Sequence, residues 1–263
     1  SEETIGTGSA EQYFKFAKEL AFVDATAHQG NDFQMSNEFW SNLDDLCEEF
    51  DVDHEFVAIP GYEWSGNTSL GGDRNVFFPT KGRKIRRSSH ALIADTSDND
   101  FDCDTANDLF EAFATNNEFD VICYAHCGGR YADINFAHDA RFEKSIEIHS
   151  SWGTFEWLLE DAFKLGYRVG IVANSDGHKG RPGASYPGAG YFGAIGGLTC
   201  FLADELSRKS IMDCMRKRRH YATTGGPSGR TLLDLEMRFS EKGLIFNDDP
   251  RFHSNKGVAS LQA

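Results

Sequence analysis

Between residues 172 and 183 the chain reads Val172-Ala173-Asn174-Ser175-Asp176-Gly177-His178-Lys179-Gly180-Arg181-Pro182-Gly183. The short apolar run that ends at Val172 predicts a buried strand, and here that strand leads into a polar loop. Since residues two apart share one face of an extended chain, Asn174, Asp176 and His178 are expected to point the same way. A carboxylate and an imidazole on one face are common metal ligands, although the pair alone also fits a hydrogen-bonded strand end.

The same arrangement recurs at four other places. Mainly apolar runs at 21–27, 56–62, 121–125 and 145–148 are each followed directly by a side chain that can bind a metal, namely His28, Glu63, His126 and His149. In a parallel α/β barrel the carboxyl ends of the strands converge on one face, where active sites lie. We therefore expect these residues to gather with Asp176 and His178 in one metal site.

Length and composition favour one large domain, alone or with a small appendage. The 263 residues carry a formal charge of −15, from 26 basic and 41 acidic side chains, which disfavours duplex nucleic acid as a partner. No apolar run is long enough to span a membrane. The six cysteines follow no disulfide framework, which favours free thiols and a cytoplasmic location, with a removed leader left open.

Helical and strand patterns alternate along residues 1–230. Capping residues and apolar stripes predict helices over 9–20, 36–50, from 105 onward, 154–165 and 207–220, and apolar runs predict further strands at 75–78 and 197–203. This alternation predicts a mostly parallel sheet. Residues 231–263 carry little periodic pattern beyond a strand at 231–237, so we interpret them as an appended tail or the start of a second domain.

Several candidate ligands also have a plainer explanation. A core histidine bonded to the backbone explains His126 equally well, and a helix cap or an arginine partner explains Glu63. In Ile146-Glu147-Ile148-His149 the isoleucines share one face, so Glu147 and His149 are expected to face the barrel interior. An unpaired charge there is costly, and a bound metal removes that cost. Three histidines are interpreted as surface residues: His54, His138 and His253.

Two arginines stand in glycine-rich turns next to predicted strands. We expect Arg74 and Arg181 to bind the phosphate group of an anionic substrate with bidentate geometry. A separate basic loop at 81–87 is explained either by solvation or by attraction of an anionic substrate to an otherwise acidic protein.

At this point the sequence resembles a known family. The order His28, Glu63, His126, His149 and Asp176-x-His178, each at a predicted strand end, resembles the PHP (polymerase and histidinol phosphatase) superfamily. Three phrases are similar to a PHP-like branch of bacterial proteins: Gly61-Tyr62-Glu63-Trp64-Ser65, Gly180-Arg181-Pro182-Gly183 and Tyr221-Ala222-Thr223-Thr224-Gly225. The resemblance covers roughly residues 1–230.

The resemblance implies a distorted seven-stranded (β/α) barrel that holds two or three metals, and mixed histidine and carboxylate ligation suits divalent Zn, Mn or Fe. It implies that Glu63 bridges metals, that His126 and His149 bind one of them, and that His28 and His178 bind another. Asp176 would complete the site. The family's opening His-x-His strand is absent from this sequence. We therefore expect the native polypeptide to extend further at its N-terminus, and the 263-residue chain to bind fewer metals than the longer form.

A metal-dependent phosphoesterase acting on a small phosphorylated substrate is the first functional hypothesis. Clustered divalent ions would lower the pKa of a water molecule and clamp phosphoryl oxygens, with Asp176 and His178 as catalytic residues. Arg74 and Arg181 would neutralise the transferring group. Two alternatives are a catalytically silent binding module braced by metal, and a metal hydrolase of non-phosphate substrates such as amides.

Overall fold

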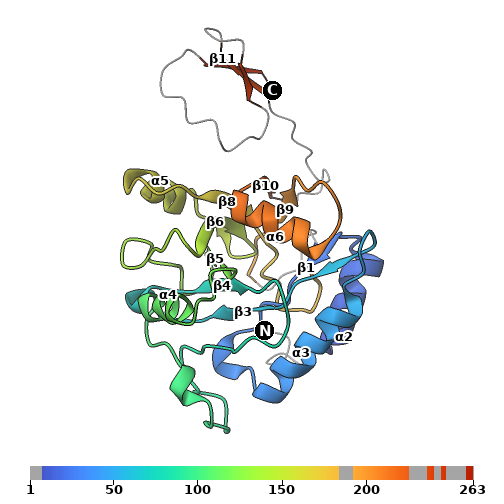
Figure 1. The fold of residues 1–263 in the computed structure, drawn as a ribbon, viewed down its shortest axis with the longest axis vertical. Helices are drawn as coiled ribbons and strands as arrows, with labels where there is room; N and C mark the ends of the chain where they lie inside the picture. Colours follow the sequence, from blue (N-terminus) through green and yellow to red (C-terminus); the bar gives the residue numbers. More distant parts are fainter. Residues whose placement is uncertain (1–7, 184–191, 225–235, 240–243, 247–258, 263) are drawn as a thin grey trace.

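The central sheet of the protein is mixed. The computed structural model describes residues 8–183, 192–224, 236–239, 244–246 and 259–262. The sheet runs in the order β3 (Gly61–Trp64), β4 (Arg74–Phe77), β5 (Ile122–Ala125), β6 (Glu143–Ser150) and β7 (Gly153–Thr154), and β8 (Gly170–Ala173) also pairs with β6 (Figure 1). The β5–β6 and β6–β8 pairs are parallel, whereas β4 is antiparallel to both β3 and β5.

The prediction of a mostly parallel sheet is therefore wrong at β4. Only the nine residues 65–73 separate β3 from β4, and a parallel connection needs a crossover of a dozen or more. As a result, β4 begins at the edge of the sheet where β3 and β5 end. Its first residues therefore lie beside the ends of its neighbours.

The remaining strands form separate small sheets. β1 (Ala25–Thr26) pairs in parallel with β2 (Val57–Ala58), and β9 (Leu198–Phe201) pairs antiparallel with β10 (His220–Thr223). In the part of the chain that the structure describes, no sheet closes on itself. The fold is thus mixed α/β as predicted, but the hydrogen-bonded strands do not form the expected seven-stranded barrel.

The tail contains more regular structure than its sequence indicates. β11 (Glu236–Phe239), β12 (Leu244–Phe246) and β13 (Ala259–Gln262) form an antiparallel sheet of their own. The strand predicted at 231–237 overlaps β11 only at its last two residues, and 231–235 lie outside the described residues.

Helix positions follow the capping residues. Ser9, Ser36, Thr105 and Ser207 each accept a backbone hydrogen bond at the start of α2 (Ala10–Lys15), α3 (Asn37–Phe50), α4 (Ala106–Thr115) and α6 (Arg208–Lys217). A π-helical turn, Phe16–Leu20, continues α2. Helix α5 (Glu156–Lys164) begins two residues later than the predicted Thr154, because Thr154 pairs with His149 in the β6–β7 ladder.

Helices α2, α3 and α4 cover one face of the central sheet, and the other face carries the site, with α6 packed against its apolar part. The largest cluster of buried apolar side chains joins α2, α3 and α4 to the outer face of β3, β4 and β5, and includes Phe14, Leu43, Tyr62, Val76 and Phe113. Helix α5 packs Leu158 and Ala162 against Ile146 of β6. Because side chains alternate along a strand, the neighbours of these buried residues face the opposite side of the sheet.

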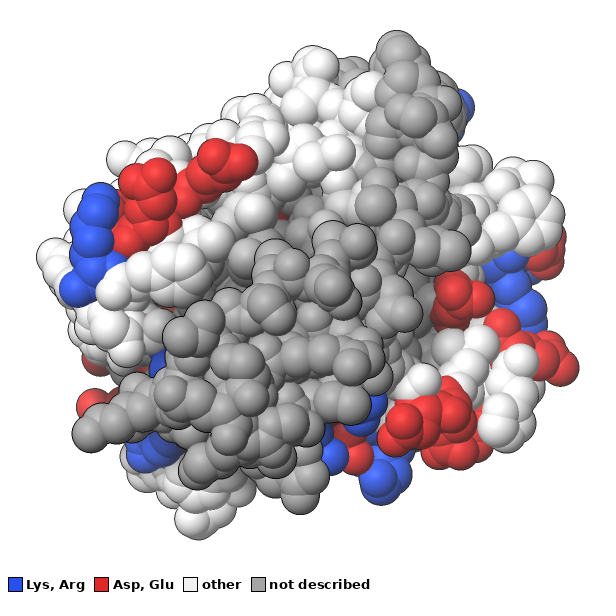
Figure 2. Space-filling model, turned by 90° about the horizontal axis from the view of Figure 1, so that it is seen from above, with Lys and Arg blue, Asp and Glu red and all other residues white. Residues whose placement is uncertain are grey.

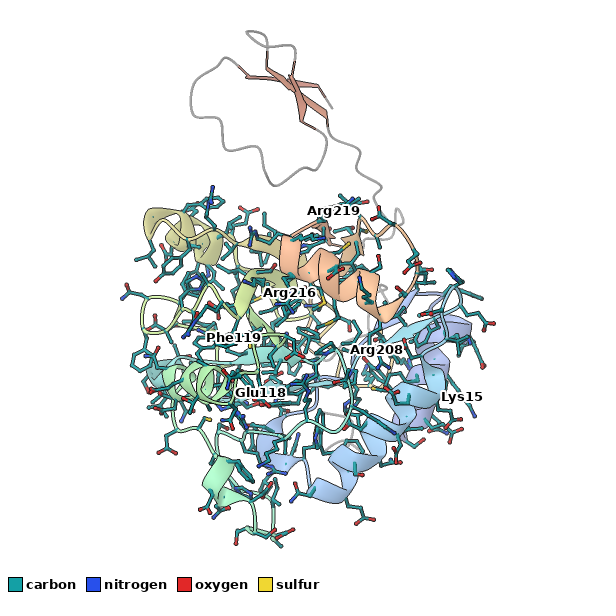
Figure 3. The ribbon with its side chains drawn as sticks, viewed as in Figure 1. Lys15, Glu118, Phe119, Arg208, Arg216 and Arg219 are labelled. Carbon is teal, nitrogen blue, oxygen red and sulfur yellow. The ribbon has the colours of Figure 1, made fainter. Side chains whose placement is uncertain are left out.

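Two arginines of α6 fasten this helix to distant parts of the chain. Arg208 donates hydrogen bonds to the carbonyls of Cys47 and Ala58 and pairs with Glu48 at the end of α3, and Arg216 donates to the carbonyls of Phe119 and Asp120 (Figure 3). On the face shown in Figure 2, described basic and acidic side chains are interspersed around the rim. Among the described residues, no helix is long and apolar enough to cross a membrane.

Candidate metal centre

Three of the predicted ligands meet at one end of the sheet. Glu63 lies on β3, His126 follows β5 directly, and Asp176 lies three residues beyond β8. His126 Nε2 is 3.6 Å from Glu63 Oε2 and 3.6 Å from Asp176 Oδ2. One donor atom from each residue falls within 4.8 Å of the others. Strands far apart in sequence thus bring one imidazole nitrogen and two carboxylate oxygens to a common point.

The orientation of His126 is set from behind by Glu147 of β6. His126 Nδ1 is 2.9 Å from Glu147 Oε2, which also accepts hydrogen bonds from the side-chain amides of Asn75 and Asn174. In the neutral ring, which is the form that binds a metal, a proton on Nδ1 satisfies this contact and leaves the lone pair of Nε2 facing Glu63 and Asp176. Histidines that bind metals are commonly held by a carboxylate in this way. Although burial lowers the pKa of His126, the Glu147 and Glu63 carboxylates raise it, so that it lies well above its ordinary value.

Glu63 is held by the loop that follows His28. Its Oε1 accepts hydrogen bonds from Asn31 Nδ2 at 2.7 Å and from Ser65 Oγ at 3.1 Å. These two donors fix the carboxylate while Oε2 remains directed at His126. The side chain is buried, so its geometry is determined by the fold and not by solvent.

Asp176 is the most constrained residue of the cluster. Its backbone adopts a left-handed conformation with φ of 44°, which a non-glycine residue rarely occupies outside functional sites or tight turns. Its carbonyl accepts a hydrogen bond from Ser151 Oγ at 2.9 Å. Burial, reinforced by nearby carboxylates and opposed by the His126 imidazole, raises the pKa of Asp176 to about 8. Its Oδ2 is buried and has no hydrogen-bond partner among the described residues.

The space beside these atoms is kept open by Gly128. A Cβ at this position would lie 2.6 Å from His126 Nε2 and 3.5 Å from Asp176 Oδ2. Together with the unpartnered Asp176 oxygen, this open space fits a bound cation. Mixed nitrogen and carboxylate ligation suits divalent ions of the zinc, manganese and iron kind.

A further carboxylate and an arginine extend the cluster. Burial, reinforced by the charge of Glu63, raises the pKa of Asp73 to about 9. Arg130 Nε is 3.2 Å from Asp73 Oδ1, and Arg130 Nη2 is 4.0 Å from Glu63 Oε1. The Arg130 guanidinium also lies 5.1 Å from the centre of the Phe33 ring, and the side chain is 35% exposed. A partly exposed cation therefore borders the acidic centre.

His149 does not join the cluster, and its prediction as a ligand to the same metal is wrong. Its Nδ1 lies 2.7 Å from Thr154 Oγ1 and its Nε2 lies 2.7 Å from the carbonyl oxygen of Ile195. Both ring nitrogens are thus used within the protein. The other member of the predicted inward pair, Glu147, is the one that contacts His126.

The structure separates the other two predicted histidine ligands. His28 is buried against the edges of aromatic rings, with its ring centre 4.9 Å from that of Tyr13 and 5.8 Å from that of Phe39, and it is not part of the three-residue cluster. His178 lies nearer, since its Nδ1 is 3.1 Å from the carbonyl oxygen of Asp176. Its ring meets the ring of Phe192 edge-on, and its side chain is 24% exposed.

The two predicted substrate-binding arginines also differ. Arg74 is fully buried on the outer face of β4, where it pairs with Glu143 and donates hydrogen bonds to the carbonyls of Gly71 and Ala137. The prediction that Arg74 contacts substrate is therefore corrected, because its contacts hold the fold together. Glu143 also binds His138, which is 6% exposed and not the surface residue expected.

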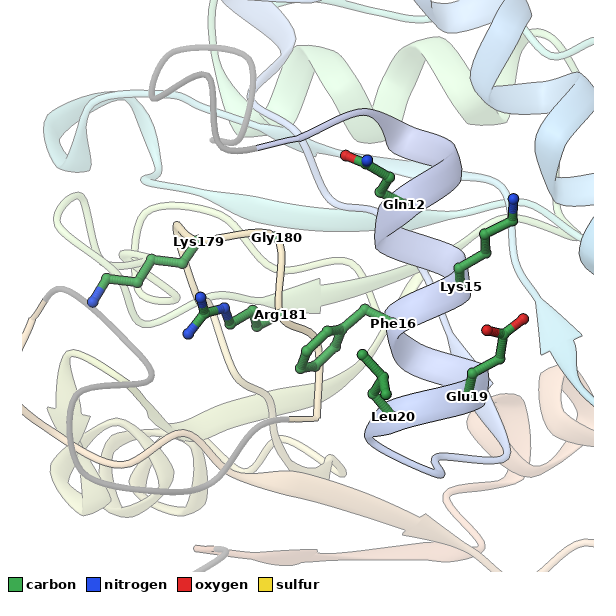
Figure 4. A pocket seen from close by; sticks show the side chains of 8 residues that line it. All are labelled: Gln12, Lys15, Phe16, Glu19, Leu20, Lys179, Gly180 and Arg181. Atoms are coloured by element: carbon green, nitrogen blue, oxygen red, sulfur yellow. The ribbon is translucent and has the colours of Figure 1, made fainter.

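Arg181 is exposed and lines a hollow of about 680 Å³ between the loop 179–181 and helix α2 (Figure 4). Lys179 and Arg181 lie on one side of it, and Gln12, Lys15 and Phe16 lie on the other. Its role in binding substrate stays a prediction.

Sequence reasoning missed several residues that build the centre: Asn31, Asp73, Asn75, Gly128 and Arg130. The alternation of side chains along β4 places Asn75 on the same face as Glu63, its partner in register, and could have identified it. The others lie in loops, where no periodicity signals their direction.

Comparison with known proteins gives distant likenesses. No protein-family model matches the chain. A Chlamydia pneumoniae protein described as uncharacterized is 22% identical over 287 residues, which cover 98% of this chain. The chain spans 42% of the length of that relative.

One solved structure shows a partial similarity. It is a two-domain protein from Bacteroides vulgatus that contains a predicted PHP-like metal-dependent phosphoesterase. The two chains are 12% identical with a TM-score of 0.47, over 80% of this chain and 60% of that one. A likeness at this level does not assign the chain to a family, and what the site can do follows from its own geometry.

Proposed function

We propose that the chain is a metal-dependent hydrolase whose substrates are phosphoesters. The observation that carries the proposal is the convergence of Glu63 Oε2, His126 Nε2 and Asp176 Oδ2 in the lining of a cavity of about 940 Å³. The buried, unpartnered Asp176 oxygen and the space kept by Gly128 support a cation at this point. A divalent ion held there supplies positive charge to phosphoryl oxygens and lowers the pKa of water.

Neighbouring side chains hold the candidate ligands in position. Glu147 holds the Nδ1 proton of His126 and so keeps Nε2 available for the cation. Asn31 and Ser65 fix one oxygen of Glu63 and leave the other for the same purpose. Burial, reinforced by neighbouring carboxylates, raises the pKa values of Asp73 and Asp176, and a divalent ion at this point would favour their charged forms.

Two further side chains are assigned to the substrate. Arg130 borders the centre, with Nη2 4.0 Å from Glu63 Oε1, so we assign it to an anionic oxygen of the substrate in place of Arg74. His178 lies against Asp176 in the same cavity, and we assign it to proton transfer at the leaving oxygen. Arg181 would attract a small phosphorylated substrate toward this region.

The test combines metal content with turnover. Purified protein is analysed for metals, stripped with a chelator, reloaded with Zn, Mn or Fe, and assayed on phosphomonoesters, phosphodiesters, lactones and amides. Metal-dependent turnover of phosphoesters is the expected result. Metal binding without turnover of any substrate would support a binding module instead. Turnover of amides or lactones alone would show that the substrates are not phosphoesters.

Variants locate the activity at the proposed centre. His126→Ala and Asp176→Asn should lose both metal and turnover, because each removes a donor atom. His54→Asn is the control, since His54 is exposed and has a left-handed backbone (φ of 66°) that asparagine tolerates. Full metal occupancy in His126→Ala would exclude the proposed ligand set.

A further inference from the structure

The cavity beside the candidate metal centre is much larger than a phosphate group requires. Its volume of about 940 Å³ is at the upper end for sites that bind small organic molecules. Glu63, His126 and Asp176 line its polar end. The remaining lining mixes polar side chains such as Asp24, Thr199 and Glu205 with a group of apolar ones: Phe77, Tyr124, Phe201, Ile211 and Met215. The polar centre and the apolar space are therefore parts of one cavity.

The alternation of side chains along β4 and β5 places polar and apolar residues of the cavity lining on the same face of the sheet. Tyr124 lies two residues before His126 on β5 and shares its face, and Phe77 stands in the same relation to Asn75 on the antiparallel β4. The rings of Phe77 and Tyr124 lie 4.9 Å apart. These side chains form an apolar layer. It begins beside Asn75, with which Tyr124 is paired in register, and continues through Phe77 away from the candidate ligands.

One atom in the apolar layer is chemically incomplete. Tyr124 is 2% exposed, and its hydroxyl has no hydrogen-bond partner among the described residues. Buried hydroxyls in folded proteins are nearly always hydrogen-bonded, because an unsatisfied one is costly. Since Tyr124 also lines the cavity, a ligand inside the cavity could supply the missing partner.

We propose that the phosphoester bound at this site carries an apolar organic group that enters the layer around Tyr124, with an oxygen placed to accept a hydrogen bond from the Tyr124 hydroxyl. This proposal rests on the proposed function for the position of the phosphate. The new element is the substrate class. It consists of phosphate esters of long-chain or polycyclic alcohols that carry an ether, hydroxyl or carbonyl oxygen. Small polar esters such as sugar phosphates would leave the apolar layer empty.

Binding by an alkyl series tests the apolar part. Methyl, hexyl and decyl phosphate, used below micelle-forming concentrations, are titrated calorimetrically into the metal-loaded protein. Burial of each added methylene should increase affinity by up to about fourfold, so decyl phosphate should bind far more tightly than methyl phosphate. Equal affinity for the three esters would overturn the proposal.

One variant and a matched control locate the alkyl group. Ala203→Phe adds a ring to a side chain that lines the cavity and should abolish the dependence of affinity on chain length, with metal content and melting temperature checked in parallel. Ala91→Phe makes the same change at an exposed position and should keep that dependence. A length dependence that survives in Ala203→Phe would show that the alkyl group binds elsewhere.

Tyr124→Phe tests the hydroxyl. The wild-type protein should prefer an ether-containing alkyl phosphate to decyl phosphate of the same length, and Tyr124→Phe should lose that preference while keeping the dependence on chain length. A preference unchanged in the variant would remove Tyr124 from the proposal. Titration with hexanol and decanol separates the apolar site from the proposed function. Binding of these alcohols that increases with chain length, without turnover of phosphoesters, would retain the apolar site and reject the proposed function.

Discussion

His126 Nδ1 lies 2.9 Å from Glu147 Oε2, and this contact decides which nitrogen of His126 faces the candidate metal centre. Glu147 is fully buried on β6 and also accepts hydrogen bonds from Asn75 and Asn174. The carboxylate is therefore held rigidly, and it holds the imidazole in turn. We therefore expect metal binding to depend on this residue as well as on the three that would contact the ion.

Glu147→Gln should weaken metal binding about 10- to 100-fold although no donor atom is removed. The amide keeps a polar group beside His126, but it no longer favours the proton on Nδ1 by its charge. Metal affinity measured by competition with a chromophoric chelator checks this expectation. Glu160→Gln, at an exposed position on α5, is the control. If both variants bind metal as the wild type does, Glu147 has no part in positioning His126.

Gly128→Ala should lower metal affinity about tenfold or more with every candidate ligand still present, the size usual when a ligand loses its support. The added methyl group would lie 2.6 Å from His126 Nε2, closer than real contacts allow, so it must displace the ring or occupy the space of the ion. Gly177→Ala is the matched control, because its Cβ would meet no atom closer than 3.9 Å. Equal affinities in the two variants would show that the space beside Gly128 is not the metal site.

The sequence was informative where function depends on local pattern. Glu63, His126 and Asp176 each follow or lie within an apolar run, and the rule that side chains at strand ends converge was enough to bring them together. The capping residues Ser36 and Thr105 likewise set helix starts to within a residue. These signals span a few residues and need no knowledge of the tertiary fold.

The sequence was uninformative where a distant segment decides the outcome. His149 has the right residue type and face, yet the carbonyl of Ile195 and the hydroxyl of Thr154 occupy its nitrogens. Arg74 was predicted from its glycine-rich surroundings, whereas its face on β4 is set by its register with Trp64 and Ala125. The alternation that places Glu63 and Asn75 inward would have placed Arg74 outward, had the strand been predicted to start one residue earlier.

Arg74→Leu should cost about 3–5 kcal/mol in the free energy of unfolding, because it leaves the buried Glu143 carboxylate without its cation. Urea denaturation measures this loss. Arg141→Leu removes a pair with Asp139 in which the Arg141 side chain is 56% exposed, and it should cost about 1 kcal/mol or less. Similar losses in the two variants would contradict the assignment of Arg74 to the stability of the fold.

His220 should make the protein less stable in mild acid. Burial, with a smaller contribution from the charge of Arg218, lowers the pKa of His220 from 6.5 to about 4, against the effect of its hydrogen bond to the Ile171 carbonyl. Because Nδ1 must donate to that carbonyl, Nε2 of the neutral ring accepts a hydrogen bond from Ser145 Oγ at 3.0 Å.

The sign follows from which state binds the proton. Between pH 6.5 and about 4 the unfolded chain protonates His220 and the folded chain does not, so stability is fully present above pH 6.5 and falls as the pH drops through this window. The gap corresponds to at most about 3 kcal/mol. His220→Asn keeps a donor for the Ile171 carbonyl but does not titrate, so the difference in unfolding free energy between wild type and variant should shrink or change sign from pH 7 to pH 4. A difference that stays constant across this range would show that the folded protein protonates His220 as readily as the unfolded chain.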